Sequence, residues 1–342
     1  MKAAVLERIG EIRVKEVPDP VPEPGGLVIN VDSCGICSTD IKMWRRGQRD
    51  LRCPRILGHE VVGTVVDSRS ECYSVGDRVQ VYPGVVCGEC HYCRTGRENL
   101  CTGIRIIGFS YDGGFAELME VPAGSVICGG VNRLPENLSS VIATLAEPLA
   151  CCLNCMGKLG VSRDDTVVVL GAGTMGLLNA ALAKLSGARV VVSEVLDERI
   201  AYAAKTGADR VVNPSEEDLV EVVMEESGGR GADVIIPAFG GATSSYDLIG
   251  MLAKGGRLCM FSGIPGDQSR REIDLNSVHY EEKLIVGAYG CTPGQNRRAI
   301  ELLSGELNLG WLPTELIALE QIEEGMRSHE QQSLRVVMRN SL

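Results

Sequence analysis

The sequence has few aromatic residues, no excess of positive charge, and no apolar run that approaches the length of a membrane span. Aromatic residues make up only 4% of the 342 residues, whereas glycines number 41, a composition that favours small-residue packing with many tight turns. The net charge of −11 argues against nucleic acids and anionic membranes as partners, because both require a basic face. Internal repeats and low-complexity tracts are also absent.

The beginning of the chain does not resemble a secretory leader. Residues 1–8 are too charged for a signal peptide, and their apolar run is too short, so we expect a cytoplasmic protein. The fourteen cysteines are then expected to be reduced thiols or metal ligands rather than disulfides. Because the length exceeds the usual size of one hydrophobic core, two domains are expected.

The first part of the chain has the pattern of short β-strands separated by Pro and Gly. The expected strands are Lys2–Leu6, Arg13–Val17, Gly26–Asp32, Glu60–Val66 and Arg78–Val81. After them, Ser139 and Ser140 are expected to cap an apolar helical run that Glu147-Pro148 interrupts.

From Thr166 onward the pattern becomes strand, glycine-rich turn and helix, repeated. The expected strands are Thr166–Leu170, Arg189–Ser193, Asp209–Val212, Asp233–Ile236, Arg257–Phe261 and Lys283–Val286. The expected helices between them are Met175–Leu185, Asp197–Lys205, Glu216–Glu226 and Thr243–Ala253. This alternation predicts a parallel, doubly wound sheet. The tail is too short to fold alone, so its helix Asn296–Leu303 and strand Leu334–Met338 are expected to return to the first domain.

A glycine-rich turn opens this second region. The run Gly171-Ala172-Gly173-Thr174-Met175-Gly176 follows an apolar strand and begins a helix, an arrangement that places backbone N–H groups around a dinucleotide pyrophosphate. Glu194 ends the next strand, about 20 residues later, where an acid binds the adenosine ribose hydroxyls. Its charge would repel a 2′-phosphate, so NAD is expected rather than NADP. Arg199 either faces that ribose or pairs with acids on the helix surface, and the second is preferred.

Four cysteines are concentrated in one loop, at Cys87, Cys90, Cys93 and Cys101. Their spacing lets the loop wrap a tetrahedral ion, and four thiolates make a closed structural zinc site. His91 lies between two of these ligands and is interpreted as a bystander.

A second group of metal-ligand types lies earlier in the chain. The run Cys37-Ser38-Thr39-Asp40 is followed about twenty residues later by Gly58-His59-Glu60, so a thiol, an imidazole and carboxylates are all present. These are ligand types of a catalytic zinc, although each run alone is also typical of an ordinary turn or strand start.

Taken together, these motifs resemble the zinc-dependent medium-chain dehydrogenase/reductase family, in particular its polyol (sorbitol-like) and threonine dehydrogenase branches. The resemblance runs nearly end to end, through both zinc motifs, Glu147-Pro148-Leu149 and the Gly171–Gly176 run, in the family's order. It implies an α/β protein with a GroES-like β-barrel-type catalytic domain (1–148), a Rossmann doubly wound parallel-sheet domain (149–287) and a C-terminal segment (288–342) that returns to the first. The active site would be the cleft between the two domains.

The resemblance also implies roles for individual residues. A catalytic zinc would be held by Cys37, His59 and a carboxylate, either Glu60 or Glu147. Asp40 would orient the histidine, as metal-bound imidazoles generally require. Thr39 would take the proton of the alcohol, and Lys42 occupies the position where many relatives have a histidine that completes the proton path. Either Lys42 or cofactor ribose hydroxyls and water would carry the proton onward, or the path differs. Ser38 replaces a basic residue that some alcohol dehydrogenases use to bind the pyrophosphate.

The implied reaction is NAD-dependent oxidation of a secondary alcohol, with zinc as a Lewis acid. Glu147 in place of a third cysteine favours polyol, sugar or amino-alcohol substrates. Five arginines between Arg45 and Arg55 favour an anionic sugar phosphate or sugar acid instead, unless they are a solvated loop paired with nearby acids. A non-catalytic NAD-binding protein is a further alternative. Relatives suggest a homodimer or homotetramer that pairs through residues 284–289.

Overall fold

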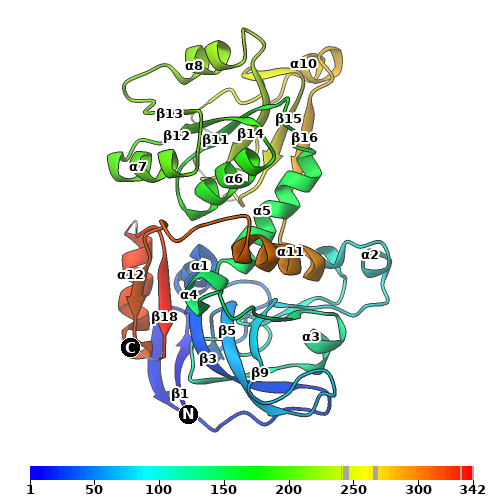
Figure 1. Cartoon of the computed structure of the whole chain (residues 1–342), viewed down its shortest axis with the longest axis vertical. Helices are drawn as coiled ribbons and strands as arrows, with labels where there is room; N and C mark the ends of the chain where they lie inside the picture. Colours follow the sequence, from blue (N-terminus) through cyan, green and yellow to red (C-terminus); the bar gives the residue numbers. More distant parts are fainter. Residues whose placement is uncertain (240, 242–245, 265–268, 332, 341–342) are drawn as a thin grey trace. The chain divides into compact units, whose positions relative to one another are not determined.

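The computed structural model describes residues 1–239, 241, 246–264, 269–331 and 333–340 (Figure 1). The chain forms two compact units, of which the first combines residues 1–150 with 291–342 and the second is residues 151–290. One helical run among the described residues, Ser140–Leu159, is long and apolar enough to pass for a membrane span by length and composition. In the most apolar stretch of this run, 61% is buried, as is usual for a core helix.

The first unit is built mainly from antiparallel strands. A three-stranded sheet has the order β2-β1-β4, a larger sheet has the order β10-β6-β5-β3-β18-β17 with β9 paired to β3, and β7 pairs with β8. The strands are β1 (Lys2–Arg8), β2 (Glu11–Glu16), β3 (Leu27–Gly35), β4 (Arg55–Ile56), β5 (Glu60–Ser68), β6 (Arg78–Val81), β7 (Gly84–Val85), β8 (Arg105–Ile106), β9 (Leu118–Val121), β10 (Val131–Arg133), β17 (Glu315–Ile317) and β18 (Val336–Arg339).

Short helices connect and cover these strands. They are α1 (Ser38–Arg46), α2 (His91–Arg94), η1 (Glu98–Leu100), α3 (Ala123–Ile127), α4 (Ser140–Ala143), α5 (Ala146–Leu159), which continues into the second unit, α11 (Pro293–Ser304), η3 (Leu319–Gln321) and α12 (Ile322–Glu330). The core of this unit includes Trp44, Phe115 and Met326, all fully buried. The end of the chain is part of that core, because β18 pairs antiparallel with β3 and buries Val336 and Met338.

The apolar helical run after Ser139 is divided in two, but not where the sequence predicts. Ser139 caps α4 as expected, with its Oγ accepting the N–H of Ile142 at 3.3 Å. The break comes before Ala146, and Pro148 lies inside the first turn of α5. The predicted interruption at Glu147-Pro148 is therefore wrong, because a proline in the first turn of a helix has no intrahelical N–H bond to lose.

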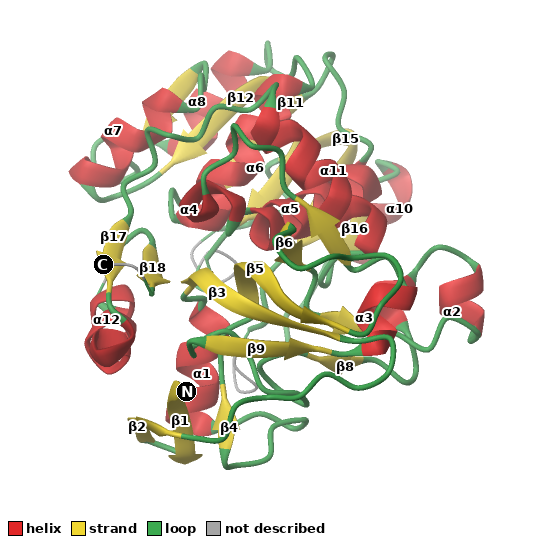
Figure 2. Cartoon of the chain, turned by 60° about the horizontal axis from the view of Figure 1, so that its bottom comes forward, coloured by secondary structure: helices red, strands yellow, loops and turns green. Residues whose placement is uncertain are grey.

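The second unit is a six-stranded parallel sheet, in the order β13-β12-β11-β14-β15-β16 (Figure 2). Its strands are β11 (Thr166–Leu170), β12 (Arg189–Ser193), β13 (Arg210–Val212), β14 (Ala232–Pro237), β15 (Leu252–Met260) and β16 (Leu284–Gly287). Its helices are α6 (Thr174–Leu185), α7 (Asp197–Lys205), α8 (Leu219–Glu226) and α10 (Leu275–Tyr280). The helices α6, α7, α8 and α10 each connect two successive strands, and the strand order reverses beside β11, so the predicted doubly wound sheet is confirmed.

Two predicted helices differ from the structure. The helix expected from Glu216 starts instead at Leu219, because the side chain of Asp218 caps it by accepting the N–H groups of Val220 and Glu221. The helix expected over Thr243–Ala253 is wrong in its described part, since residues 246–251 form bends and turns and β15 begins at Leu252. Residues 243–245 lie outside the described residues. A short apolar run does not distinguish a buried strand from a helix by its periodicity.

Candidate functional site

Cys37 lies at the turn between β3 and α1, as the residue that caps the helix. Its Sγ accepts the backbone N–H of Thr39 at 3.4 Å, and the carboxylate of Asp40 accepts the backbone N–H of Cys37 at 2.9 Å. These two reciprocal bonds satisfy N–H groups at the start of the helix that have no intrahelical partner. The helix start therefore fixes the position of the thiol.

Asp40 also reaches the second half of the motif. Its Oδ1 accepts the backbone N–H of Gly58 at 3.2 Å and lies 3.2 Å from Nδ1 of His59. Both the carboxylate and the imidazole are buried, and the ring of Phe109 meets the imidazole edge-on at 5.5 Å. With Nδ1 turned to Asp40, Nε2 is the imidazole nitrogen left for a metal.

Glu60 begins β5 and faces Gly35 on β3. Its Oε2 lies 2.8 Å from an Nη of Arg335, and the same guanidinium nitrogen donates to Thr144 Oγ1 at 2.7 Å. A Cβ on Gly35 would lie 2.0 Å from Oε2, so only glycine leaves room for this carboxylate. Both members of the ion pair have 3% of their side chains exposed. The carboxylate is thus held in one place by a buried cation.

Together these elements gather three ligand types. Donor atoms of Cys37, His59 and Glu60 lie within 4.8 Å of one another, close enough for one metal ion to bridge them. Burial disfavours the charged imidazole, but Asp40 and Cys37 raise the pKa of His59 well above its ordinary value. Neighbours that attract a proton this strongly also favour a bound cation, so the group fits a zinc ion.

The structure separates the two carboxylates that the sequence left as alternatives. Glu60 lies in the group with Cys37 and His59, whereas the carboxylate of Glu147, on α5, lies within 4.8 Å of the thiol of Cys291. A part for Glu147 in zinc binding stays a prediction. Lys42 lies on the exposed side of α1, and Thr39 is partly buried in its first turn.

Two residues near this group were not predicted from the sequence. Arg335, which pairs with Glu60, and His329, whose Nε2 lies 3.3 Å from Ser38 Oγ, both come from the end of the chain. Their partners are 275 and 291 residues away. No local pattern marks either residue, and only the return of the C-terminal segment to the first unit brings them to the site.

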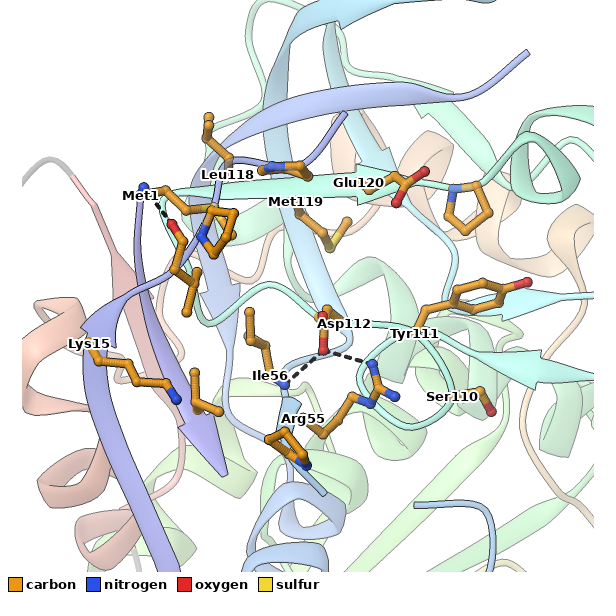
Figure 3. Close-up of a pocket in the computed structure, with 17 residues that line it drawn as sticks. Met1, Lys15, Arg55, Ile56, Ser110, Tyr111, Asp112, Leu118, Met119 and Glu120 are labelled. Carbon is orange, nitrogen blue, oxygen red and sulfur yellow. Dashed lines mark hydrogen bonds and ion pairs between the residues drawn. The ribbon is translucent and has the colours of Figure 1, made fainter. Parts of the chain in front are cut away.

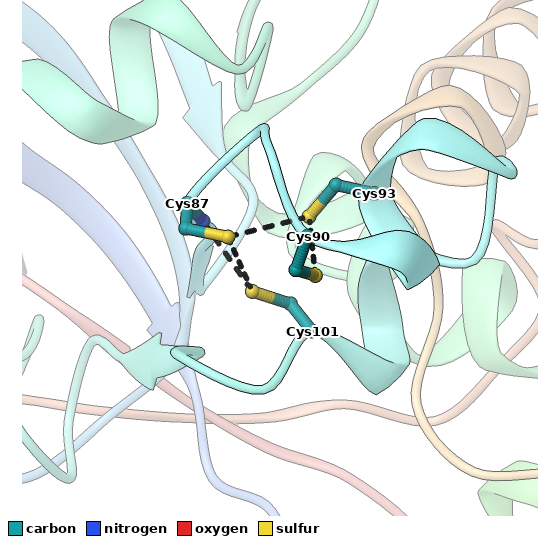
Figure 4. A group of neighbouring side chains, drawn as sticks. All are labelled: Cys87, Cys90, Cys93 and Cys101. Carbon is teal, nitrogen blue, oxygen red and sulfur yellow. Dashed lines mark hydrogen bonds between the residues drawn. The ribbon is translucent and has the colours of Figure 1, made fainter.

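The four cysteines of the second motif converge in the loop between β7 and β8 (Figure 4). The Sγ–Sγ distances are 4.0 Å from Cys87 to Cys93, 3.6 Å from Cys90 to Cys93 and 3.4 Å from Cys87 to Cys101. Four sulfurs around a tetrahedral zinc, with bonds of about 2.3 Å, lie about 3.8 Å apart. The loop therefore holds its thiols at the spacing that zinc requires.

The electrostatic surroundings of these thiols also favour a bound cation. The backbone amides of Cys93 and Thr102 lower the pKa of Cys90 to about 5. Burial and the adjoining thiols of Cys90 and Cys101 raise the pKa of Cys93 to about 12. Four thiolates in contact repel one another, so the last of them ionises at neutral pH only when a cation is bound.

Replacing Cys93 by alanine is expected to lower the zinc content by one ion per chain and to lower the melting temperature, because three remaining thiols do not close the site. Mass spectrometry of the metal content and thermal unfolding measure the two effects. The matched control is Cys72→Ala, which removes an exposed thiol outside the loop and should leave both quantities unchanged. Equal zinc content in Cys93→Ala and the wild type would contradict a structural site.

The glycine-rich run lies between β11 and α6, as a dinucleotide loop requires. Gly171 has a φ of +98°, and a Cβ on Gly176 would lie 1.9 Å from the carbonyl oxygen of Gly171. A Cβ on Gly173 would meet nothing within 4 Å. Gly171 and Gly176 are thus needed by the turn and by helix packing, whereas the space at Gly173 is open to a ligand. Thr174 and Met175 are the first two residues of α6.

Glu194 follows β12 and faces this loop. Its carboxylate accepts the backbone N–H groups of Ala172 at 2.8 Å, Val195 at 2.7 Å and Leu196 at 3.1 Å. The side chain is buried, so a fixed negative charge lies beside the glycine-rich turn. Arg199 lies in the first turn of α7. Ligand binding by either residue stays a prediction.

The arginines between Arg45 and Arg55 are largely engaged within the first unit. Arg45 pairs with Glu330 at 2.7 Å, and Arg49 pairs with Asp50 at 3.2 Å. Two backbone carbonyls accept from Arg52 at 2.9 Å. Arg55 pairs with Asp112 at 2.8 Å inside a cavity of about 460 Å³ (Figure 3). These contacts favour a loop paired with its own acids over a site that grips an anionic substrate.

Comparison with known proteins identifies two matching families and their relatives. Residues 23–129 match the family described as the alcohol dehydrogenase GroES-like domain, and residues 174–305 match the zinc-binding dehydrogenase family. L-threonine 3-dehydrogenase from Pyrococcus abyssi is 38% identical over 283 residues, which cover 81% of this chain and 78% of that protein.

Two solved structures extend the comparison. A zinc-binding dehydrogenase from Sinorhizobium meliloti 1021, bound to NADP, has a TM-score of 0.89 at 30% identity, over 99% of this chain and 98% of that one. The 2R,3R-butanediol dehydrogenase from Bacillus subtilis has a TM-score of 0.88 at 27% identity, over 99% of each chain. The predicted combination of a GroES-like domain with a Rossmann-like sheet is confirmed.

Proposed function

Since the chain belongs to the zinc-dependent medium-chain dehydrogenase family, and is thus an oxidoreductase of the zinc-type alcohol dehydrogenase class, we propose that it oxidises a secondary hydroxyl of a small polyol to the ketone, with NAD as hydride acceptor. The observation that carries the proposal is the group formed by Cys37, which is partly buried at the start of α1, with the buried His59 and Glu60. This group offers a metal both negative charge and a fixed geometry.

Each residue has a part in this reaction. Cys37, His59 and Glu60 would hold a zinc ion, which when bound would supply a Lewis acid for the substrate hydroxyl. Asp40 keeps the imidazole in one tautomer and orientation, and Arg335 holds the carboxylate of Glu60. The hydroxyl of Thr39 then receives the proton.

Two kinds of relative support a small polar secondary alcohol as the substrate. One is named for 2R,3R-butanediol, which carries two adjacent secondary hydroxyls. The engagement of the Arg45–Arg55 arginines with nearby acids and carbonyls gives no support to an anionic substrate. L-threonine is the second candidate, because several relatives are named L-threonine 3-dehydrogenase and its side chain is also a secondary alcohol.

A substrate panel tests the proposal. The purified, zinc-loaded protein would be supplied with NAD and, in turn, a polyol, L-threonine, a sugar phosphate, a sugar acid and a primary alcohol, while the absorbance of reduced nicotinamide is followed. We expect the highest kcat/KM with a polyol, and a preference for L-threonine would select the second candidate. Absence of turnover with every compound, at full zinc content, would favour a non-catalytic NAD-binding protein.

The cofactor preference is proposed to rest on Glu194. Glu194→Gln keeps a side-chain oxygen for the backbone N–H groups but removes the charge that opposes a 2′-phosphate. The ratio of kcat/KM for NADP to that for NAD is expected to rise about tenfold, which corresponds to ~1.4 kcal/mol. Glu198→Gln, an exposed acid on α7, is the control and should leave the ratio unchanged. A wild type that already prefers NADP would disprove this role.

A homodimer is proposed to form through β16. This strand ends the order of the parallel sheet, and Leu284 and Ile285 on it are 53% and 41% exposed. An apolar edge strand is a template for pairing with another chain. Light scattering should give at least twice the mass of one chain for the wild type and the mass of one chain for Leu284→Lys. A wild-type monomer at micromolar concentration would contradict the proposal.

A further inference from the structure

Two buried thiols touch each other inside the second unit. Cys155 lies on α5 and Cys259 near the end of β15, and the Sγ of Cys155 donates to the Sγ of Cys259 at 3.2 Å. Both side chains are fully buried, and both cysteines are free thiols. Neither belongs to a metal-ligand group of the described residues. The pair is therefore chemistry that the zinc sites and the proposed reaction do not use.

We propose that Cys155 and Cys259 are a site of reversible oxidation, at which a peroxide converts the two thiols into a disulfide within the second unit. The inference is independent of the proposed reaction. The thiolate of Cys259 attacks one oxygen of hydrogen peroxide and the O–O bond breaks, so that Cys259 becomes a sulfenic acid and the other oxygen takes up a proton and leaves as water. The sulfur of Cys155 then attacks that of the sulfenic acid, the S–S bond forms and a second water leaves. Two thiols are oxidised and one peroxide is reduced.

The positions of the two sulfurs suit this bond. An S–S bond is about 2.05 Å long, so each sulfur has to move by only about 0.6 Å from the contact at 3.2 Å. Cys259 is held in the sheet, where it pairs with Val286 of β16. On α5, the thiol of Cys152, one turn before Cys155, donates to the carbonyl oxygen of Met175 at 3.7 Å. Both backbones are thus fixed by other contacts, and the thiols stay together.

The surroundings of the pair make its two sulfurs unequal. The hydrogen bond from Cys155 lowers the pKa of Cys259, burial opposes this effect, and the ammonium of Lys158 lowers the pKa further. The same hydrogen bond, together with burial, raises the pKa of Cys155. Because a thiolate is the form that attacks a peroxide, Cys259 is the sulfur that is oxidised first, and Cys155 is the one that closes the disulfide.

Burial of the pair also selects the oxidant. Neither thiol is exposed, so an oxidant reaches them only during local opening of the second unit. Such an opening admits a molecule close to water in size more readily than a peptide disulfide. We therefore expect reaction with hydrogen peroxide and not with oxidised glutathione. The thiols of Cys53 and Cys72 are exposed and should react with both reagents.

The disulfide would close a large ring in the second unit. Its two ends are 104 residues apart, and the ring contains the strands β11 to β14 and the glycine-rich turn. A cross-link that closes a long ring restricts the unfolded chain more than one that closes a short ring. Oxidation should therefore stabilise the second unit against unfolding, and reduction should reverse the effect.

Peptide mapping tests the site. The reduced, zinc-loaded protein is treated with hydrogen peroxide, the remaining thiols are alkylated, and the digest is analysed by mass spectrometry without reduction. We expect a peptide that contains Cys155 joined to one that contains Cys259, two hydrogens lighter than their sum, which dithiothreitol separates. Cys152→Ser changes a neighbouring thiol of the same helix and is the matched control, in which the same disulfide should form. Oxidised glutathione should not produce it.

Two variants and hydrogen exchange test the order of oxidation and its effect. Cys155→Ser should leave one added oxygen on Cys259, because no thiol condenses with the sulfenic acid, whereas Cys259→Ser should leave Cys155 unoxidised. The slowest amides of β11 and β14 should exchange at least about tenfold more slowly in the oxidised wild type, and peroxide should cause no such change in Cys155→Ser. Wild-type protein in which Cys155 and Cys259 remain free thiols, or join other cysteines instead, would overturn the proposal. Equal reaction with oxidised glutathione would overturn it as well.

Discussion

Replacing Cys37 by alanine is expected to lower kcat/KM by about 10³-fold or more with the fold retained. The variant lacks the thiolate of the buried group, and a metal Lewis acid contributes several kcal/mol to the stabilisation of developing charge, at about tenfold per 1.4 kcal/mol. The zinc content should fall by one ion per chain. Steady-state kinetics, metal analysis and circular dichroism together measure these effects.

The matched control for this variant is Cys53→Ala. Cys53 is an exposed thiol in the same unit and belongs to none of the three cysteine-containing groups of the described residues, so its loss should leave activity and zinc unchanged. Appreciable activity in Cys37→Ala would remove Cys37 from the catalytic site. Loss of zinc from both metal groups at once would mean that the variant has unfolded rather than lost a ligand.

Replacing Arg335 by glutamine is expected to lower the free energy of unfolding of the first unit by about 3–5 kcal/mol. The reason is the burial of its partner, because in the zinc-free protein, on which the measurement is made, Glu60 would keep a charge that neither water nor a cation compensates. Urea unfolding followed by tryptophan fluorescence measures the change. Both tryptophans, Trp44 and Trp311, belong to the first unit and report on it alone.

Two further variants separate this effect from a general loss of charge. Arg327→Gln removes an exposed arginine paired with Glu323, and the free energy should change by less than about 1 kcal/mol. The double variant Glu60→Gln with Arg335→Gln should recover part of the stability, because no buried charge remains unpaired. If Arg335→Gln is as stable as the wild type, the buried ion pair does not form.

Local spacing explains most of what the sequence predicts correctly. The dimensions of one turn determine the spacing of Gly171, Gly173 and Gly176, and the reach of one loop determines the spacing of the four cysteines. Each motif therefore specifies its own geometry. The parallel strands of the second unit are also continuous apolar runs, which are easily recognised. These features need no information about distant parts of the chain.

What the sequence does not predict depends on distant partners. The sequence left Glu60 and Glu147 as alternatives, and only the fold places Glu60 beside Cys37 and His59 and against Arg335 from the C-terminal segment. His329 has no motif of its own for the same reason. The start of β15 is missed because Leu252 and Ala253 are apolar in either a helix or a buried strand, and pairing with β14 selects the strand.

The first unit is built from two separate stretches of the chain, so its two parts are synthesised at different times. A ribosome completes the whole second unit, residues 151–290, before it makes β18 and Arg335. At 5–20 residues per second, Arg335 is made roughly ten to forty seconds after residue 150. Until then the carboxylate of Glu60 lacks its guanidinium partner. During that interval β3 lacks β18, its neighbour in the sheet. The first-made part of the nascent chain is therefore the part most prone to aggregation and to binding the wrong metal. A product truncated before β18 would contain the cysteine loop, but Glu60 would lack Arg335.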